Sequence, residues 1–260
     1  MRGARILVLA LAPPIIQIQD LYKSFGENHV LQGINLDIGA GTTQVILGGS
    51  GSGKSVLMKH MIGLLRPDKG QVIIDCEDIS QMPENELARV RKKFGMVFQG
   101  AALFDSMTVY ENVSFPLREH NKRMPEAEIK KRVHEKLDIV GLKDIDAQFP
   151  DQLSGGMRKR VGLARAIILE PKIVLYDEPT TGLDPITTDY VDEMILDAKS
   201  KLGVTSVVIS HDIASAFKVA DEIAFLYQGK LVARGTPKEM RKATHPKVHE
   251  FLSTWFGKNE

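Results

Sequence analysis

The stretch Leu47–Lys59 reads L-G-G-S-G-S-G-K-S-V-L-M-K, and the rest of the chain is organised around it. The apolar run at 44–47 precedes the glycines and is typical of a buried strand. After the glycines, Val56, Leu57 and Met61 are apolar at helical spacing. The pattern G-x-x-x-x-G-K-S therefore lies between a strand and a helix, where a phosphate-binding loop must lie.

The residue types of this loop fit a triphosphate. Glycine lets the backbone curl tightly enough to present many N–H donors, and the helix N-terminus adds a positive dipole end. Lys54 is expected to reach the β- and γ-phosphates and the Ser55 hydroxyl to bind Mg²⁺. A plain Gly-Ser turn is the alternative. The residues expected to bind the nucleotide are Gly48, Gly49, Ser50, Gly51, Ser52, Gly53, Lys54, Ser55 and Val56.

The composition restricts the class of protein. The 260 residues are 43% hydrophobic and 26% charged, which is ordinary for a globular protein with a full core. The net charge of +1 argues against a protein that binds nucleic acid through bulk charge. The single cysteine, Cys76, excludes an intrachain disulfide, and we expect it to be a small apolar residue ending a strand at 71–75. No stretch approaches the ~20 apolar residues that span a bilayer.

The N-terminus is unusual. Arg2 and Arg5 precede an apolar run at 6–12, and Pro13-Pro14 follows, which faintly resembles a signal peptide. The run is short and lacks a clear cleavage site, so we expect residues 1–14 to be a disordered leader or the product of a misassigned start codon.

Three segments with β character, 15–21, 30–38 and 71–75, predict an antiparallel sheet beside the parallel one. Phe25 precedes the turn between the first two and is a candidate for stacking on the adenine ring, because an aromatic face binds any flat base. From spacing alone, Phe25 is equally an ordinary core aromatic, and Tyr22 competes for the stacking role.

The segment 93–99 predicts a strand that ends at Gln99 and opens into a Gly-Ala-Ala loop. An amide there can contact Mg²⁺ or the attacking water, although a solvent-facing loop glutamine is the alternative. A mostly helical region follows at about 109–169. Within it Ile129, Val133, Leu137 and Val140 form one apolar stripe.

Ser154 is a good N-cap candidate for a further helix at 158–169. Gly155 and Gly156 leave backbone N–H groups free, so this helix start is suited to bind an anion. A capped helix with a glycine pair is the alternative.

Two acidic residues, Asp177 and Glu178, end the apolar strand predicted at 173–176. Adjacent carboxylates point different ways, so Asp177 is expected to hold Mg²⁺ and Glu178 to orient or deprotonate water. A turn signal is the alternative. His211 ends the next buried strand and is expected to contact the γ-phosphate, because α/β ligands bind at the carboxyl edge of the sheet.

The C-terminal part predicts a hairpin at 222–227 and 230–233, and then a charged helical tail. Four apolar residues near its end lie at i, i+1, i+4 and i+5: Phe251, Leu252, Trp255 and Phe256.

Taken together, residues 15–240 resemble the ATP-binding-cassette (ABC) ATPases. The motifs that carry the resemblance are G-G-S-G-S-G-K-S at 48–55, Gln99, L-S-G-G-M at 153–157, I-V-L-Y-D-E-P at 173–179, G-L-D-P at 182–185 and His211. The resemblance implies an α/β fold of the P-loop NTPase type, with a mixed RecA-like core sheet, an antiparallel β subdomain and a helical subdomain at about 100–169. It also implies one ATPase domain at 15–244 and a tail at 245–260.

The same resemblance implies roles for single residues. Phe25 would stack on adenine, and Gln99 would lie in the loop that faces a membrane partner. Ser154 and Gly156 would bind the γ-phosphate held by the opposite protomer, and Asp184 would make a contact across the dimer. Met157 departs from the family's usual glutamine, which leaves a role for that side chain unsupported.

The sequence around the motifs is similar to the ATPases of mammalian-cell-entry (MCE) type transporters, including the bacterial Mla system for phospholipid traffic. The similar segments are 96–117, 153–167 and 175–186. The similarity implies an ATP-sandwich homodimer with Mg²⁺ at the cytoplasmic face of the inner membrane. Its implied partners are an MlaE-like permease, an MCE-domain periplasmic protein and a small STAS-domain accessory protein, with no nucleic acid.

Three other functions are open at this point. The first is the ATPase of another ABC importer or exporter, for amino acids or lipoproteins, which has the same catalytic motifs. The second is a cassette acting on ribosomes or DNA, which usually carries two cassettes or large insertions. The third is a non-catalytic nucleotide-binding module, which the presence of Lys54, Glu178 and His211 disfavours.

Overall fold

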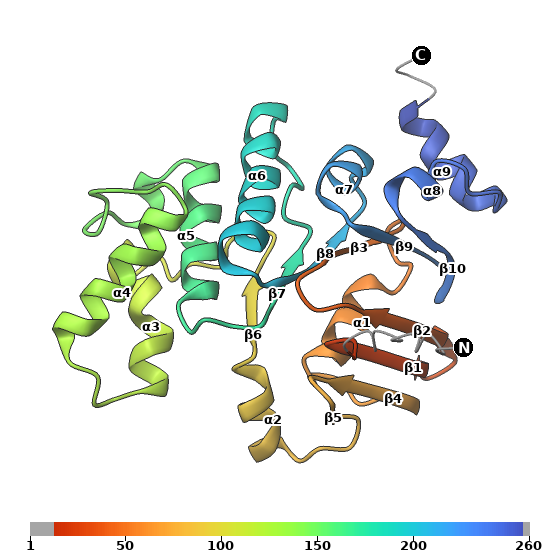
Figure 1. Cartoon of the computed structure of the whole chain (residues 1–260), viewed down its shortest axis with the longest axis horizontal. Coiled ribbons are helices and arrows are strands. Elements are labelled where there is room, and N and C mark those ends of the chain that lie inside the picture. Colours follow the sequence, from red (N-terminus) through yellow and green to blue (C-terminus); the bar gives the residue numbers. More distant parts are fainter. Residues whose placement is uncertain (1–12, 257–260) are drawn as a thin grey trace, which may run out of the picture.

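The computed structural model describes residues 13–256, without the side chain of Phe256. A six-stranded sheet runs through its middle and is formed by β3 (Thr43–Leu47), β6 (Phe94–Val97), β7 (Ile173–Asp177), β8 (Thr205–Ser210), β9 (Glu222–Tyr227) and β10 (Lys230–Gly235). The strand order is β10-β9-β3-β8-β7-β6 (Figure 1). All neighbours are parallel except β10, which pairs with β9 in the antiparallel hairpin that the sequence predicts.

A second sheet has the order β2-β1-β4-β5 and is antiparallel, as the sequence predicts for the segments that form β1, β2 and β4. Its strands are β1 (Ile16–Phe25), β2 (Asn28–Ile38), β4 (Lys69–Ile74) and β5 (Glu77–Asp78). The expectation for Cys76 is wrong, since this residue is exposed in the turn between β4 and β5. Asp75 and Cys76 have φ angles of 51° and 66°, a left-handed pair that matches the tight turn of a two-residue hairpin.

Helices lie in the region predicted at about 109–169 and in further segments along the chain. They are α1 (Lys54–Met61), α2 (Glu84–Arg91), α3 (Val109–His120), α4 (Glu126–Ile139), α5 (Gly155–Ile167), α6 (Pro185–Leu202), α7 (Ile213–Val219), α8 (Pro237–Met240) and α9 (Pro246–Phe256), with a 3₁₀ turn at Pro150–Gln152. Between residues 13 and 256, none of these helices is long and apolar enough to cross a bilayer.

The strand predicted at 93–99 is shorter than expected. β6 ends at Val97 because the chain turns at once, with the Ala101 N–H donating to the Phe98 carbonyl. Ala101 and Ala102 have φ angles of 62° and 48°, which take the chain out of the sheet. Gln99 therefore lies in the connecting loop and not at the end of the strand.

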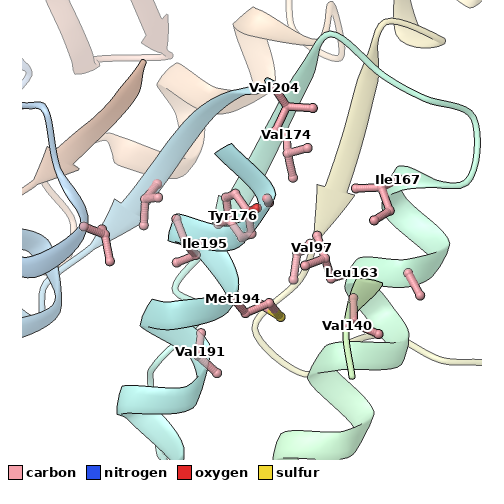
Figure 2. Close-up of a cluster of buried hydrophobic side chains, with 14 of the residues drawn as sticks. Val97, Val140, Leu163, Ile167, Val174, Tyr176, Val191, Met194, Ile195 and Val204 are labelled. Atoms are coloured by element: carbon pink, nitrogen blue, oxygen red, sulfur yellow. The ribbon is translucent and has the colours of Figure 1, made fainter. Parts of the chain in front are cut away.

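Apolar residues alternate between the two faces of the central sheet. On β7, Val174 and Tyr176 face one hydrophobic cluster, whereas Ile173 and Leu175 face the other. The first cluster includes α5, α6, α7 and α9, and Figure 2 shows side chains of β6, β7, α5 and α6 meeting there. The second lies against α1 and the antiparallel sheet. Both faces of the sheet are therefore buried, as for parallel strands in general.

The helices α3, α4 and α5 gather at one side of the molecule, beyond β6 (Figure 1). The predicted apolar stripe of α4 is confirmed, because Ile129, Val133, Leu137 and Val140 are all buried in the first cluster. Ser154 caps α5 as predicted, and its Oγ accepts the Met157 N–H at 3.2 Å. This helical part therefore packs as one unit onto the sheet.

The apolar tail is also a candidate for contact with a second protomer or a partner, and the structure shows its contacts within one chain. Within this chain, α9 packs on its own cassette, with Val248 and Leu252 buried in the first cluster. The Phe251 ring stands edge-on to Phe225 of β9, with the ring centroids 5.1 Å apart. Intrachain packing therefore explains the spacing of the described apolar residues, and Phe256 lies outside the described side chains.

Replacing Leu252 with alanine is expected to lower the free energy of unfolding by about 2–3 kcal/mol, because it removes a buried side chain from this contact. Urea unfolding measures the change, with exposed Ser253→Ala as the matched control. Equal stability of the two variants would mean that α9 does not pack on the cassette in solution.

Candidate nucleotide-binding site

The loop between β3 and α1 has a backbone that admits little besides glycine at two positions. A Cβ on Gly48 would lie 2.3 Å from the Leu226 carbonyl oxygen of β9, so no side chain fits there. Gly53 starts α1 with a φ of 107°, in the left-handed region. The first turn of α1 thus begins immediately after a tight loop, with N–H groups that lack intrahelical partners.

A cavity of about 610 Å³ opens over this loop. It brings the predicted loop residues, except Gly48, together with Gln99, Glu178 and His211, which come from three other segments. Three residues that sequence reasoning did not assign to the site complete the lining, namely Val30, Thr181 and Phe251. Phe251 reaches the cavity from α9, about 200 residues from the loop, and only its apolar spacing in the tail marked it beforehand.

Lys54 lies at the floor of this cavity and is 7% exposed. Its ammonium donates to the carbonyls of Gly48 at 2.8 Å and Gly49 at 3.0 Å. The Glu178 carboxylate lies 3.6 Å away. A buried cation with a fixed position beside free N–H groups is suited to bind the terminal phosphates of a nucleotide.

Glu178 is held from several sides. Its Oε2 lies 2.7 Å from His211 Nδ1 and accepts the Thr181 hydroxyl at 3.1 Å. Its own backbone is left-handed, with a φ of 49°, and its N–H donates to the Ile209 carbonyl of β8 at 2.9 Å. Such a conformation costs about 1–3 kcal/mol in a residue other than glycine and is imposed by the surrounding structure. The carboxylate is thereby aimed into the cavity, where it can accept a proton from water.

Asp177 ends β7 next to Glu178 but does not line the cavity. Burial raises the pKa of its carboxyl, and the neighbouring charge of Glu178 raises it further. The two adjacent acids therefore lie in different environments.

Phe25, the candidate for stacking on adenine, is not among the residues that line the cavity. The residue is 48% exposed at the end of β1, and the Lys23 ammonium lies 5.6 Å from its ring centroid. It is thus not a core aromatic. Tyr22, its competitor, likewise has a cation, Lys69, 5.0 Å from its ring.

The remaining predicted residues, Ser154, Gly155, Gly156 and Asp184, also lie outside the cavity. Ser154 is exposed. Asp184 is the N-cap of α6, where its Oδ1 accepts the N–H groups of Ile186 and Thr187 at 3.1 and 3.0 Å. A Cβ on Gly156 would lie 3.2 Å from the Thr187 methyl, so the start of α5 packs close to the start of α6. These residues form a second group at the surface of the same chain.

The profile of the family described as ABC transporter matches residues 31–181, which include the loop, Gln99 and Glu178. The chain belongs to the ABC transporter family. As such it is an ATP-binding subunit that hydrolyses ATP, and its cassette has the expected sheet and helices.

Relatives and solved structures agree with this membership. The mkl protein of Mycobacterium leprae, named as a ribonucleotide transport ATP-binding protein, is 44% identical over 92% of this chain and 68% of its own length. The intermembrane phospholipid transport ATP-binding protein MlaF of Escherichia coli is 38% identical over 92% and 88%. The structure of cbiO1 from Clostridium perfringens, part of an ABC transporter complex, has a TM-score of 0.83 at 31% identity and covers 95% of this chain and 97% of its own.

The ABC cassette MJ0796 has been solved as a dimer bound to ADP and Pi. It has a TM-score of 0.77 at 33% identity, and the match covers 85% of this chain and 98% of that one.

A buried carboxyl lies between α6 and α7 of this ABC cassette. Asp192 of α6 is 3% exposed and accepts the Ser215 hydroxyl of α7. Burial raises its pKa from 3.8 to about 6. Because the unfolded chain loses this proton first, the group stabilises the fold below its ordinary pKa, and that stability is lost as the pH rises through 6.

Replacing Asp192 with asparagine is therefore expected to raise stability relative to the unmodified protein as the pH rises from about 4.5 to about 7.5. The relative gain is about 2 kcal/mol, because asparagine stays neutral and can still accept from Ser215. Urea unfolding at the two pH values measures it, with exposed Asp197→Asn as control. A pH-independent difference would mean that Asp192 is already ionised in the folded protein.

Proposed function

We propose that this chain drives a membrane transporter for phospholipids and that two copies enclose ATP between them. The observation that carries the two-copy arrangement is the separation of the two groups of residues. Ser154 is exposed and far enough from the loop that none of 153–157 lines the 610 Å³ cavity. A second copy in head-to-tail orientation would supply these N–H groups to the γ-phosphate.

The residues of the cavity account for hydrolysis. Lys54 and the N–H groups of the loop hold the β- and γ-phosphates, and His211 lies beside Glu178 to contact the γ-phosphate. Glu178 accepts a proton from water as the water oxygen bonds to the γ-phosphorus and the bond to the bridging oxygen breaks. Loss of the γ-phosphate, which contacts both protomers in this arrangement, then loosens the dimer.

Mg²⁺ fits the donor set at this edge of the sheet. The Ser55 hydroxyl, the Gln99 amide and the Asp177 carboxylate are oxygen donors, which this cation prefers. They would hold it together with phosphate oxygens and water, and the bound ion would neutralise charge on those oxygens.

An apolar groove of about 310 Å³ supports docking of a permease. It lies beside the Gln99 loop, and Phe98 is exposed at its edge. The rings of Phe104 and Phe115 also line it, with their centroids 5.0 Å apart. A cytoplasmic segment of an MlaE-like permease would bury these rings. Because the groove lies beside the Gln99 loop, a movement of Gln99 would displace the bound segment. The chain would then lie peripherally at the cytoplasmic face of the inner membrane.

The names of relatives support the cargo. MlaF relatives act in phospholipid transport by name, and they match over most of their length. An MCE-domain periplasmic protein and a STAS-domain accessory protein are the further partners that we propose. The mkl relatives carry a ribonucleotide name, so ribonucleotide is the second candidate cargo.

Purification of the tagged full chain from detergent-solubilised membranes tests the function. We expect an integral membrane protein and an MCE-domain protein to co-purify with enriched phospholipid, and a Phe98→Asp variant to lose them while keeping ATPase activity. A membrane partner that carries nucleotide or amino acid and no enriched lipid would reject the phospholipid proposal.

A further inference from the structure

Lys159 is a buried lysine that the mechanism above does not use. It lies on α5, five residues after Ser154, and is 5% exposed. Its ammonium donates to the Pro179 carbonyl. It forms no ion pair with any residue between 13 and 256. Burial lowers its pKa, with no nearby carboxylate to oppose the effect. Burying a cation without a paired carboxylate costs folding free energy, so the presence of a lysine here needs an explanation.

Another buried lysine of the helical part is paired with a carboxylate, which is the usual arrangement for a buried ammonium. Lys136 of α4 has a similar exposure, but its ammonium reaches Glu170 at 3.1 Å. For packing alone, a methionine at 159 would fill comparable space without burying a charge. The contact with Pro179 is therefore the feature of Lys159 that needs explaining.

Pro179 directly follows the two acids that end β7, and the loop that it begins leads to Asp184. A second contact from the same helix reaches the other catalytic loop. The Arg165 guanidinium donates to the Ala101 and Ala102 carbonyls at 2.8 Å each, just after Gln99. A single rigid helix thus begins at Ser154 and is fastened to the loops that carry Glu178 and Gln99.

We propose that Lys159 is a positioning residue for ATP hydrolysis, which ties the start of α5 to the loop behind Glu178. A γ-phosphate bound at Ser154 in one protomer then adjusts the Glu178 of that same protomer. In a symmetric dimer each nucleotide would in this way prepare the other site. This inference rests on the proposed two-protomer site.

The test uses the purified full chain with Lys159→Met, which keeps the length and removes the donor. We expect kcat to fall about tenfold to a hundredfold, because small misplacements of a catalytic group have effects of that size. KM should stay within about twofold, since the ATP-binding loop is untouched. Hydrogen exchange adds a readout that does not depend on turnover: ATP should slow exchange at 178–184 in the unmodified protein and should not do so in the variant.

Two further variants separate positioning from folding. Lys136→Met removes a buried ammonium of the same helical part and should keep kcat, whereas Lys159→Gln keeps an N–H donor and should recover part of it. If Lys159→Met does not fold, Lys159→Gln decides: ATP-dependent protection of 178–184 as in the unmodified protein supports the inference, and its absence overturns it.

Unchanged kcat in Lys159→Met, or equal losses in Lys159→Met and Lys136→Met, would also overturn it. Failure of the two-protomer site has a different signature, since Ser154→Ala would then leave turnover intact.

Discussion

Replacing Lys54 with alanine is expected to lower ATP turnover by about 100- to 1,000-fold, the usual effect of removing a donor that stabilises developing charge. The ammonium is buried at the floor of the cavity, where water screens it poorly. Negative charge grows on the bridging oxygen and the β-phosphate as the bond to the γ-phosphorus breaks, so a cation fixed beside them lowers the barrier. ATP affinity should fall as well, because part of this attraction exists before the reaction.

The folded state itself should survive this substitution. The ammonium contacts carbonyls of its own loop and one carboxylate, and alanine relieves the desolvation of a buried cation. We therefore expect the melting temperature without nucleotide to stay close to that of the unmodified protein. The rise in melting temperature that ATP causes should largely disappear, since it depends on the affinity.

Two variants act as controls. Lys130→Ala removes an exposed lysine of α4 and should change neither quantity. Lys54→Arg keeps the charge but replaces a compact ammonium with a broad fork, so it should recover little activity in so tight a loop. A Lys54→Ala preparation, free of contaminating ATPase, that turns over at a near-normal rate would contradict the assignment of this loop.

Local signals predicted most of the elements. The strands β3, β7 and β9 are largely apolar runs that end or begin at a glycine or an acidic residue, and helices such as α5 and α6 have caps, Ser154 and Asp184. The alternation on β7 places neighbouring side chains in opposite clusters, which is a property of the strand itself. The grouping of the loop with Gln99, Glu178 and His211 follows because the strands before them end at one edge of the sheet.

What could not be predicted depends on contacts between distant segments. The left-handed backbone of Glu178 is imposed by the pairing of its N–H with β8, and no residue preference announces it. Phe251 lines the cavity only because α9 folds back over β9. The contact between Lys159 and Pro179 joins elements 20 residues apart, which spacing rules do not cover.

The structure distinguishes the two adjacent acids that the sequence places at the end of β7. Asp177 and Glu178 are neighbours of the same chemical type, but only Glu178 reaches the cavity and is held by His211 and Thr181. Asp177 lies outside the lining, with a raised pKa. A substitution that removes the basicity of Glu178 and keeps its shape therefore tests the proton-accepting role by itself.

Replacing Glu178 with glutamine is expected to lower kcat by about 100- to 10,000-fold, the range for loss of general base catalysis. Glutamine can still accept the Thr181 hydroxyl and lie beside His211, so ATP binding should persist. Because the γ-phosphate is then removed only slowly, two protomers should stay together for longer. Size-exclusion chromatography with light scattering should show a dimer with ATP and a monomer with ADP.

Glu135→Gln, an exposed residue of α4, is the matched control and should form no lasting dimer. A Glu178→Gln protein that remains monomeric in saturating ATP, while binding it as tightly as the unmodified chain, would remove the nucleotide from the dimer interface. A variant that hydrolyses ATP at the unmodified rate would instead assign the proton transfer to another group, and His211 would be the next to replace because its Nδ1 is 2.7 Å from the lost carboxylate.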